Sequence, residues 1–182
     1  KDCLIQLLEG WKRNQDCVVA RKGSVIMQLD KESKLYLANK QLYDKIDRHH
    51  EITLLGCNIS KDTEISVVFG TGGVLYRPSY FDRDVYDFRI KNSDKKIKHM
   101  FFVDDVFLSG YLGFKGITKK AIAFEKSEFL NYINGKNKTL LDVSTKNREV
   151  NPLIDINGKS AKLEATDVCI QYFKDYLVRQ KK

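Results

Sequence analysis

Two adjacent carboxylates, Asp104 and Asp105, follow the apolar run 100–103 and are the residues in this sequence best suited to acid–base chemistry. Like charges this close destabilise each other, which makes one carboxylate a better proton acceptor, as a general base requires. The spacing in residues 104–114 predicts a helix that begins at the two acids, where the helix dipole favours negative charge. Because neighbouring helical residues point about 100° apart, we expect one carboxylate to face a site and the other to cap the helix. In the alternative interpretation, both acids only cap the helix.

A glycine-rich turn, Gly70-Thr71-Gly72-Gly73, lies upstream of the acids and follows a run of strand type. Glycines let backbone amides approach a phosphate or a sugar closely. The turn has neither the Lys-Ser/Thr of a phosphate loop nor the spacing of a dinucleotide fingerprint, so a plain turn is an open alternative. Tyr76, Arg77 and Tyr80 follow the turn. Their side chains could stack on a bound sugar or form hydrogen bonds with it, although the tyrosines could equally serve packing.

The apolar spacing predicts helices near both ends of the chain and short strands between them. Residues 2–11 are predicted as an amphipathic helix and residues 165–179 as the clearest helix, with Thr166 able to cap its start. Residues 24–29 and 34–38 are predicted as a hairpin, and residues 21–23 as a turn. Other strands are predicted at residues 17–20, 52–55, 65–69, 74–76 and 121–124, with a helical turn at 79–82. The expected fold class is α/β, an α+β mixed sheet with flanking helices.

The composition is that of a globular protein, with 182 residues of which 42% are hydrophobic, so we expect a single domain over residues 1–182. No apolar run approaches the roughly 20 residues that a membrane helix needs. Because the sequence starts with Lys1, we expect it to be a piece of a larger protein, with residues 125–182 as a C-terminal extension that ends in the amphipathic helix. The four cysteines are far apart, which argues against a zinc or thiol redox centre and favours a reducing compartment, the cytoplasm.

The two motifs occur in a characteristic order. The run VVFGTGGVLYRPSYFD (residues 67–82) is followed by FFVDDVFLSGYL (residues 101–112) and then by Gly116-Ile117. This arrangement resembles the acceptor-side half of GT-A-type glycosyltransferases, in which a glycine-rich segment containing LYRP precedes an acidic pair that opens a helix. The resemblance covers about residues 17–124 and depends on both motifs together.

The resemblance implies an enzyme that transfers a sugar from a nucleotide-sugar donor to a hydroxyl of a glycan or protein acceptor. It implies that Asp105 is the general base and that Asp104 orients the acceptor or caps the helix. Gly72 and Gly73 would line the sugar pocket. The physical logic is sound, because an acceptor hydroxyl is a poor nucleophile until a positioned carboxylate takes its proton.

The resemblance also implies a divalent metal, Mg²⁺ or Mn²⁺, bound by a DxD-like acidic cluster. The sequence departs from the pattern here, because no such cluster precedes Gly70 and the nucleotide-binding units expected before Lys1 are missing. His99 is a further candidate ligand. The chain is therefore expected to be a fragment, to receive its nucleotide half from elsewhere, or to have lost activity.

A non-catalytic basic binding module is the alternative to an enzyme. The formal net charge of +8 would attract anionic partners such as nucleic acid, and a protein partner is also open. Recognition of nucleic acid would need aromatic residues interleaved with basic ones on one face, and the sequence contains no such tract. Nucleic acid is therefore not the expected partner.

Overall fold

We analysed a computed structural model of the chain, which describes residues 2–29, 31–32, 34–43, 51–85, 103–125 and 161–178. The helices are α1 (Asp2–Arg13), α2 (Lys34–Ala38), α3 (Lys40–Tyr43), α5 (Asp104–Phe114) and α8 (Ala161–Tyr172). The strands are β1 (Val18–Ala20), β2 (Lys22–Ile26), β3 (Glu51–Leu55), β4 (Thr63–Glu64), β5 (Val67–Val68), β6 (Val74–Leu75) and β7 (Lys119–Ala121). Single 3-10 turns cover Met27–Leu29, Gly56–Asn58, Gly70–Gly72 and Pro78–Tyr80.

The described strands form two small sheets. One has the order β4-β7-β1-β6, in which β1 runs parallel to β7 and antiparallel to β6. The other has the order β3-β2-β5 and is antiparallel throughout. The chain passes from β5 of the second sheet to β6 of the first through the glycine-rich turn. This turn is therefore a joint between the two sheets.

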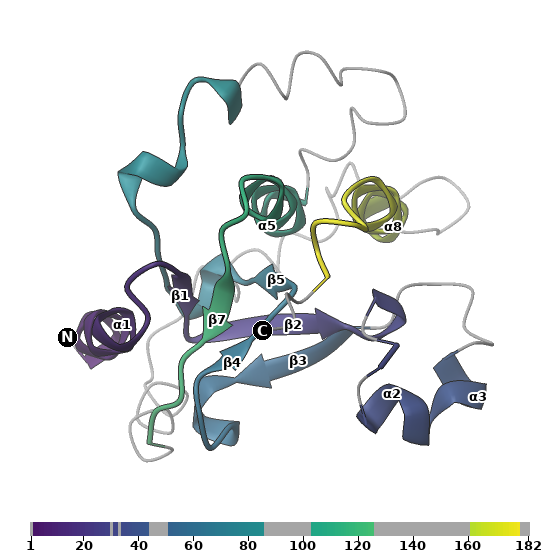
Figure 1. The fold of residues 1–182 in the computed structure, drawn as a ribbon, viewed down its shortest axis with the longest axis horizontal. Coiled ribbons are helices and arrows are strands. Elements are labelled where there is room, and N and C mark those ends of the chain that lie inside the picture. Colours follow the sequence, from purple (N-terminus) through teal and green to yellow (C-terminus); the bar gives the residue numbers. More distant parts are fainter. Residues whose placement is uncertain are drawn as a thin grey trace, which may run out of the picture.

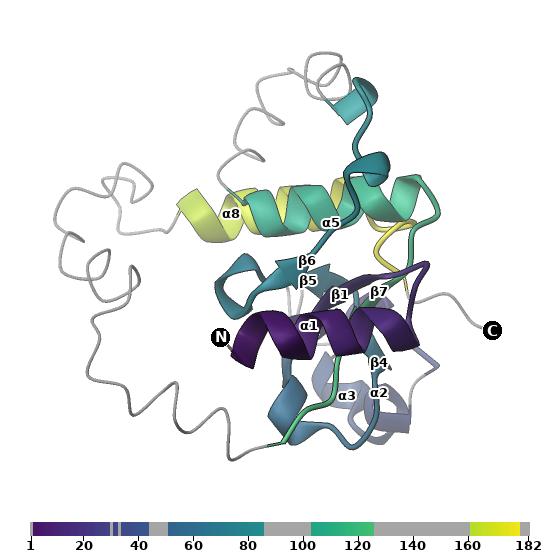
Figure 2. The same cartoon turned by 90° about the vertical axis from the view of Figure 1, so that its left-hand side faces the viewer.

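Helices cover the sheets on different sides (Figures 1 and 2). α5 and α8 lie side by side and share a buried cluster with β2 and β5, which includes Ile26, Val67, Phe107 and Phe173. α1 packs elsewhere, with Leu7 against Val19 and Ile122. The fold is a mixed α/β arrangement with flanking helices, as the sequence predicts.

The contact between α5 and α8 is close because glycines face the partner helix. A Cβ atom added at Gly110 would collide with the ring of Phe173, and one at Gly113 would collide with the backbone oxygen of Tyr176. Both residues that occupy this space are aromatic and directly follow the end of α8, and Phe173 is fully buried. The final helix, predicted as the end of a C-terminal extension, thus contributes to the same core as α5.

Several predicted elements are confirmed, although their ends differ. The helix at residues 104–114 has the predicted bounds, and the helix at residues 2–11 continues to Arg13. The strands predicted at 17–20, 52–55 and 74–76 correspond to β1, β3 and β6. The predicted strand 65–69 is ordered as a strand only at Val67–Val68, and the helical turn predicted at 79–82 is the 3-10 turn at Pro78–Tyr80.

Other predictions are wrong. Residues 34–38 form helix α2 rather than a hairpin strand, since Leu, Lys and Ala favour a helix and five residues are too few for periodicity to decide. Residues 22–23 belong to β2 and pair with β3, so they are not a turn. The last strand lies at Lys119–Ala121 instead of 121–124. Thr166 does not cap the final helix, which begins one turn earlier at Ala161.

Lys119 in β7 is a buried cation, and it gives stability a specific pH dependence. Its side chain is 4% exposed, and its Nζ donates a hydrogen bond to the backbone oxygen of Ser109 at 2.9 Å. Burial lowers the pKa of Lys119 from 10.5 to about 8, and the charge of Glu64 only partly opposes this shift. A lowered lysine pKa means that the unfolded chain binds more protons than the folded chain at pH values between 8 and 10.5.

We therefore expect Lys119 to add about 2 kcal/mol to the free energy of unfolding between about pH 8 and pH 10. Denaturant titrations of the wild type and of Lys119→Met at several pH values measure this contribution as the difference between the two proteins. The comparison is needed because Cys169, whose pKa is raised from 9.0 to about 12, opposes the gain above about pH 9, and Tyr76 and Tyr111, whose pKa values are raised from 10.0 to about 12, oppose it above about pH 10. An unchanged slope in Lys119→Met would contradict the prediction.

Candidate functional site

The glycine-rich turn owes its sequence to tight packing and an unusual backbone angle. Gly73 has φ of +89°, a conformation that residues with a Cβ rarely adopt. A Cβ at Gly72 would lie 2.6 Å from the Cβ of Lys22 at the start of β2. A Cβ at Gly73 would lie 2.8 Å from the Sγ of Cys3 in α1. Gly72 and Gly73 therefore pack against β2 and α1, and these contacts account for both glycines.

Helix α5 is fastened to the end of β5 by two side chains on the same face. The backbone N–H of Gly70 donates a hydrogen bond to Oδ1 of Asp105 at 2.9 Å. The backbone N–H of Val68 donates to Oγ of Ser109 at 3.0 Å. Asp105 and Ser109 are four residues apart in the helix, which is a rise of about 6 Å, and Val68 and Gly70 are two residues apart in extended chain, which is about 6.6 Å. The two spacings are similar, so both hydrogen bonds can form at once. The contact brings the acidic pair and the glycine turn together.

The two adjacent carboxylates have different partners, as predicted. Asp104 is exposed, and its Oδ1 accepts a hydrogen bond from the backbone N–H of Asp105 at 3.0 Å. Asp105 is partly buried and accepts from Gly70 instead. Asp104 thus satisfies an amide of its own helix, whereas Asp105 is directed at the glycine turn.

Tyr76 and Arg77 point to different sides of the chain. Burial and the negative charges of Asp105 and Asp104 raise the pKa of Tyr76 to about 12. The guanidinium of Arg77 lies over the ring of Trp11 in α1, with Cζ 5.2 Å from the ring centroid. Side chains alternate along an extended segment, which explains the separation. The structure therefore joins Asp105 to Gly70 and places Arg77 against α1.

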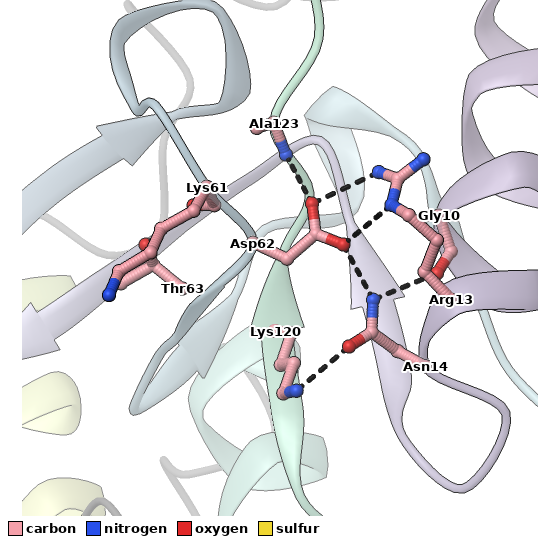
Figure 3. A network of polar contacts seen from close by, with 8 residues as sticks. All are labelled: Gly10, Arg13, Asn14, Lys61, Asp62, Thr63, Lys120 and Ala123. Atoms are coloured by element: carbon pink, nitrogen blue, oxygen red, sulfur yellow. Dashed lines mark hydrogen bonds and ion pairs between the residues drawn. The ribbon is translucent and has the colours of Figure 1, made fainter.

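Asp62, which the sequence offers only as an isolated acid, is the centre of a polar network (Figure 3). Its carboxylate accepts two hydrogen bonds from Arg13, at 2.9 and 3.0 Å, and one from Nδ2 of Asn14 at 2.7 Å. A fourth comes from the backbone N–H of Ala123 at 2.8 Å. Asn14 in turn accepts a hydrogen bond from Lys120. The network joins the end of α1 to the segments around β4 and β7.

Partial burial acts to raise the pKa of Asp62, but the hydrogen bonds from Arg13, Ala123 and Asn14 outweigh it and hold the pKa below its usual value. This carboxylate therefore stays ionised and acts as an anchor. The donors come from two parts of the chain, residues 13–14 and residue 123, which are distant from Asp62 and from each other, and no short motif marks them. Sequence reasoning could not have found the network.

A cavity of about 350 Å³ lies beside this network and is lined by Ile5, Gln6, Glu9, Arg13, Ala123, Phe124 and Glu125. It includes none of the predicted site residues. Within the described ranges, no three His, Cys, Asp or Glu side chains are grouped as a metal site. His99 lies outside those ranges. None of the four cysteines forms a disulfide, and Cys169 is buried while the other three are half-buried.

None of the described helices is long and apolar enough to cross a membrane. Comparison of the chain with protein-family models, with curated proteins and with solved structures gives no match.

Proposed function

We propose that this chain is the acceptor-side part of a GT-A-type glycosyltransferase, in which Asp105 is the general base. The observation that carries the proposal is the 2.9 Å hydrogen bond from the Gly70 N–H to the Asp105 carboxylate. It links the two motifs on which the resemblance depends, although they are far apart in the sequence. Tyr76, whose pKa is raised by burial and by the charge of the same carboxylate, would contact the bound sugar.

The proposed chemistry uses Asp105 as a fixed proton acceptor. The Gly70 N–H holds one carboxylate oxygen, so the side chain keeps one orientation. In an inverting reaction, the acceptor hydroxyl gives its proton to this carboxylate while its oxygen bonds to the anomeric carbon of the donor. The nucleoside diphosphate leaves with the electron pair of the broken glycosidic bond. Asp104 would orient the acceptor or only cap the helix.

The donor side of the reaction would be supplied by residues outside the described part of the chain. A nucleotide-sugar usually needs a divalent cation to neutralise its diphosphate. The described residues offer no set of ligands for Mg²⁺ or Mn²⁺, so we assign none of the metal chemistry to them. The absence of disulfides among the four cysteines supports a reducing compartment, and we propose the cytoplasm.

The cation–aromatic contacts occupy three of the rings that a nucleic-acid-binding module could use, whereas Phe114, Tyr172 and Tyr176 are exposed. Stacking of bases needs accessible aromatic faces. Here three rings are each covered by a cation of the same chain, namely Trp11 by Arg77, Phe124 by Arg21 and Phe69 by Lys22.

The test is a transfer assay on the complete polypeptide that contains this chain. A panel of nucleotide-sugars is supplied with Mn²⁺ or Mg²⁺, and release of the nucleoside diphosphate is followed with and without glycan and peptide acceptors. We expect release from one donor that increases with the acceptor. Absence of both donor binding and release for the whole panel would overturn the proposal and leave the non-catalytic binding module.

A further inference from the structure

The segment that carries Tyr76 and Arg77 is fastened at its far end by Asp82. Oδ1 of Asp82 accepts a hydrogen bond from the hydroxyl of Tyr111 at 2.8 Å, and Oδ2 accepts one from Nζ of Lys115, also at 2.8 Å. Both donors belong to the end of α5 and the residue that follows it. Tyr111 is fully buried, so its hydroxyl would be costly to leave without the hydrogen bond to Asp82. Lys115 also lies 3.8 Å from Asp84.

Aromatic rings continue this attachment back to Tyr76. The ring of Phe81 stacks on that of Tyr111, with centroids 6.4 Å apart and planes at 12°. Phe81 also meets Tyr76, edge-on at 5.4 Å. Tyr76 is half-buried against the core. The rings thus form a continuous row from Tyr111 to Tyr76.

Helix α5 therefore carries both the proposed base and the residue that holds Asp82. Asp105 at its start is the proposed base, and Tyr111 near its end holds Asp82. About 9 Å of rigid helix separates the two, at a rise of 1.5 Å per residue. Residues 76–82 contact the end of this helix and the residue after it through Phe81 and Asp82.

We propose that Asp82 is a positioning residue, which holds the segment 76–82 on α5 so that Tyr76 keeps its place at the end of the row of rings and can orient the sugar acceptor. This role rests on the proposed transferase function. Asp82 itself does not touch the site, and its effect passes through Phe81 and Tyr76.

The first experiment measures the attachment directly in the native chain. Trypsin cleaves after Arg83, which is exposed and adjacent to Asp82. In Asp82→Ala, the hydrogen bonds from Tyr111 and Lys115 are lost together with the one from the backbone N–H of Asp84, and we expect cleavage at this bond to become about fivefold faster. Tyr111→Phe removes only the first of them and should give a smaller increase. Acidic residues next to the cleaved bond themselves slow trypsin, so each rate is divided by that of a short peptide with the same residues around Arg83, and equal ratios in Asp82→Ala and the wild type would overturn the attachment.

The second experiment separates positioning from a purely structural role. In the complete polypeptide, Asp82→Ala should raise KM for the acceptor about fivefold and leave kcat within about twofold, because the base is intact. An unchanged KM would overturn the positioning role while transfer by the wild type upheld the proposed function. No transfer by the wild type would overturn the function, and the cleavage rates alone would then show whether Asp82 holds the segment.

Discussion

Replacing Asp105 by Asn is expected to lower kcat for sugar transfer by about a hundred- to ten-thousand-fold, the range for loss of a general base. The free energy of unfolding should change by less than about 1 kcal/mol, because the amide oxygen of Asn can still accept the Gly70 N–H. What the variant loses is the ability to take up a proton. Initial rates in the complete polypeptide and denaturant titrations of the same preparation measure the two effects.

Two further variants make the result specific. Asp104→Asn is the matched control, and it should retain most of the activity because the Asn side-chain oxygen can still accept the amide N–H of Asp105. Asp105→Ala removes the acceptor as well and should lower both activity and stability. Turnover by Asp105→Asn close to that of the wild type would exclude Asp105 as the base. A large loss of stability in Asp105→Asn would instead assign the carboxylate a structural role.

Asp62→Ala is expected to lower the free energy of unfolding by about 3 kcal/mol, which is a large effect for one residue. The substitution removes the acceptor for four hydrogen bonds, including one from the buried Asn14. Arg13 is half-exposed and can be hydrated again, so its share of the loss is small. The unpaired Asn14 and Ala123 amides account for most of the cost. Urea or guanidinium titration measures the change, with Asp84→Ala as an exposed control.

The ionisation of Asp62 should also make the free energy of unfolding depend on pH in the acid range. The pKa of Asp62 is lowered from 3.8 in the folded chain, so its contribution is complete above that value and is lost as the pH falls below it. The wild type should therefore lose stability below about pH 4, and Asp62→Ala should lose less over the same range. Parallel acid limbs in the two proteins would show that the network contributes little.

The sequence was most informative where local pattern and local chemistry agree. Helix α5 has the predicted bounds because an acidic start, regular apolar spacing and the glycines near its end all specify the same segment. The different partners of Asp104 and Asp105 follow from helix geometry alone. Short strands and turns were less predictable, since α2 and the first residues of β2 depend on tertiary contacts that a five-residue pattern cannot reveal.

The remaining features depend on residues that are distant in the sequence. A lysine in a polar stretch is normally expected in solvent, yet Lys119 is buried because β7 lies between β1 and β4 and under α5. The separation of Tyr76 from Arg77 required knowledge of which helix lies on each side of the chain. The sequence suggested that the glycine turn and the acidic pair belong to one site. The hydrogen bond between Gly70 and Asp105 depends on how α5 packs on β5, which the sequence does not reveal.

The glycine contacts of α5 have a consequence for shortened forms of the protein. Phe173 and the backbone of Tyr176 fill the space beside Gly110 and Gly113, so the segment that follows α8 packs directly against the helix that carries Asp105. A splice form or proteolytic product that ends before Ala161 would expose the apolar surface of Val106 and Phe107 to water. Such a product would retain every residue of both motifs and still be unable to hold the carboxylate in place.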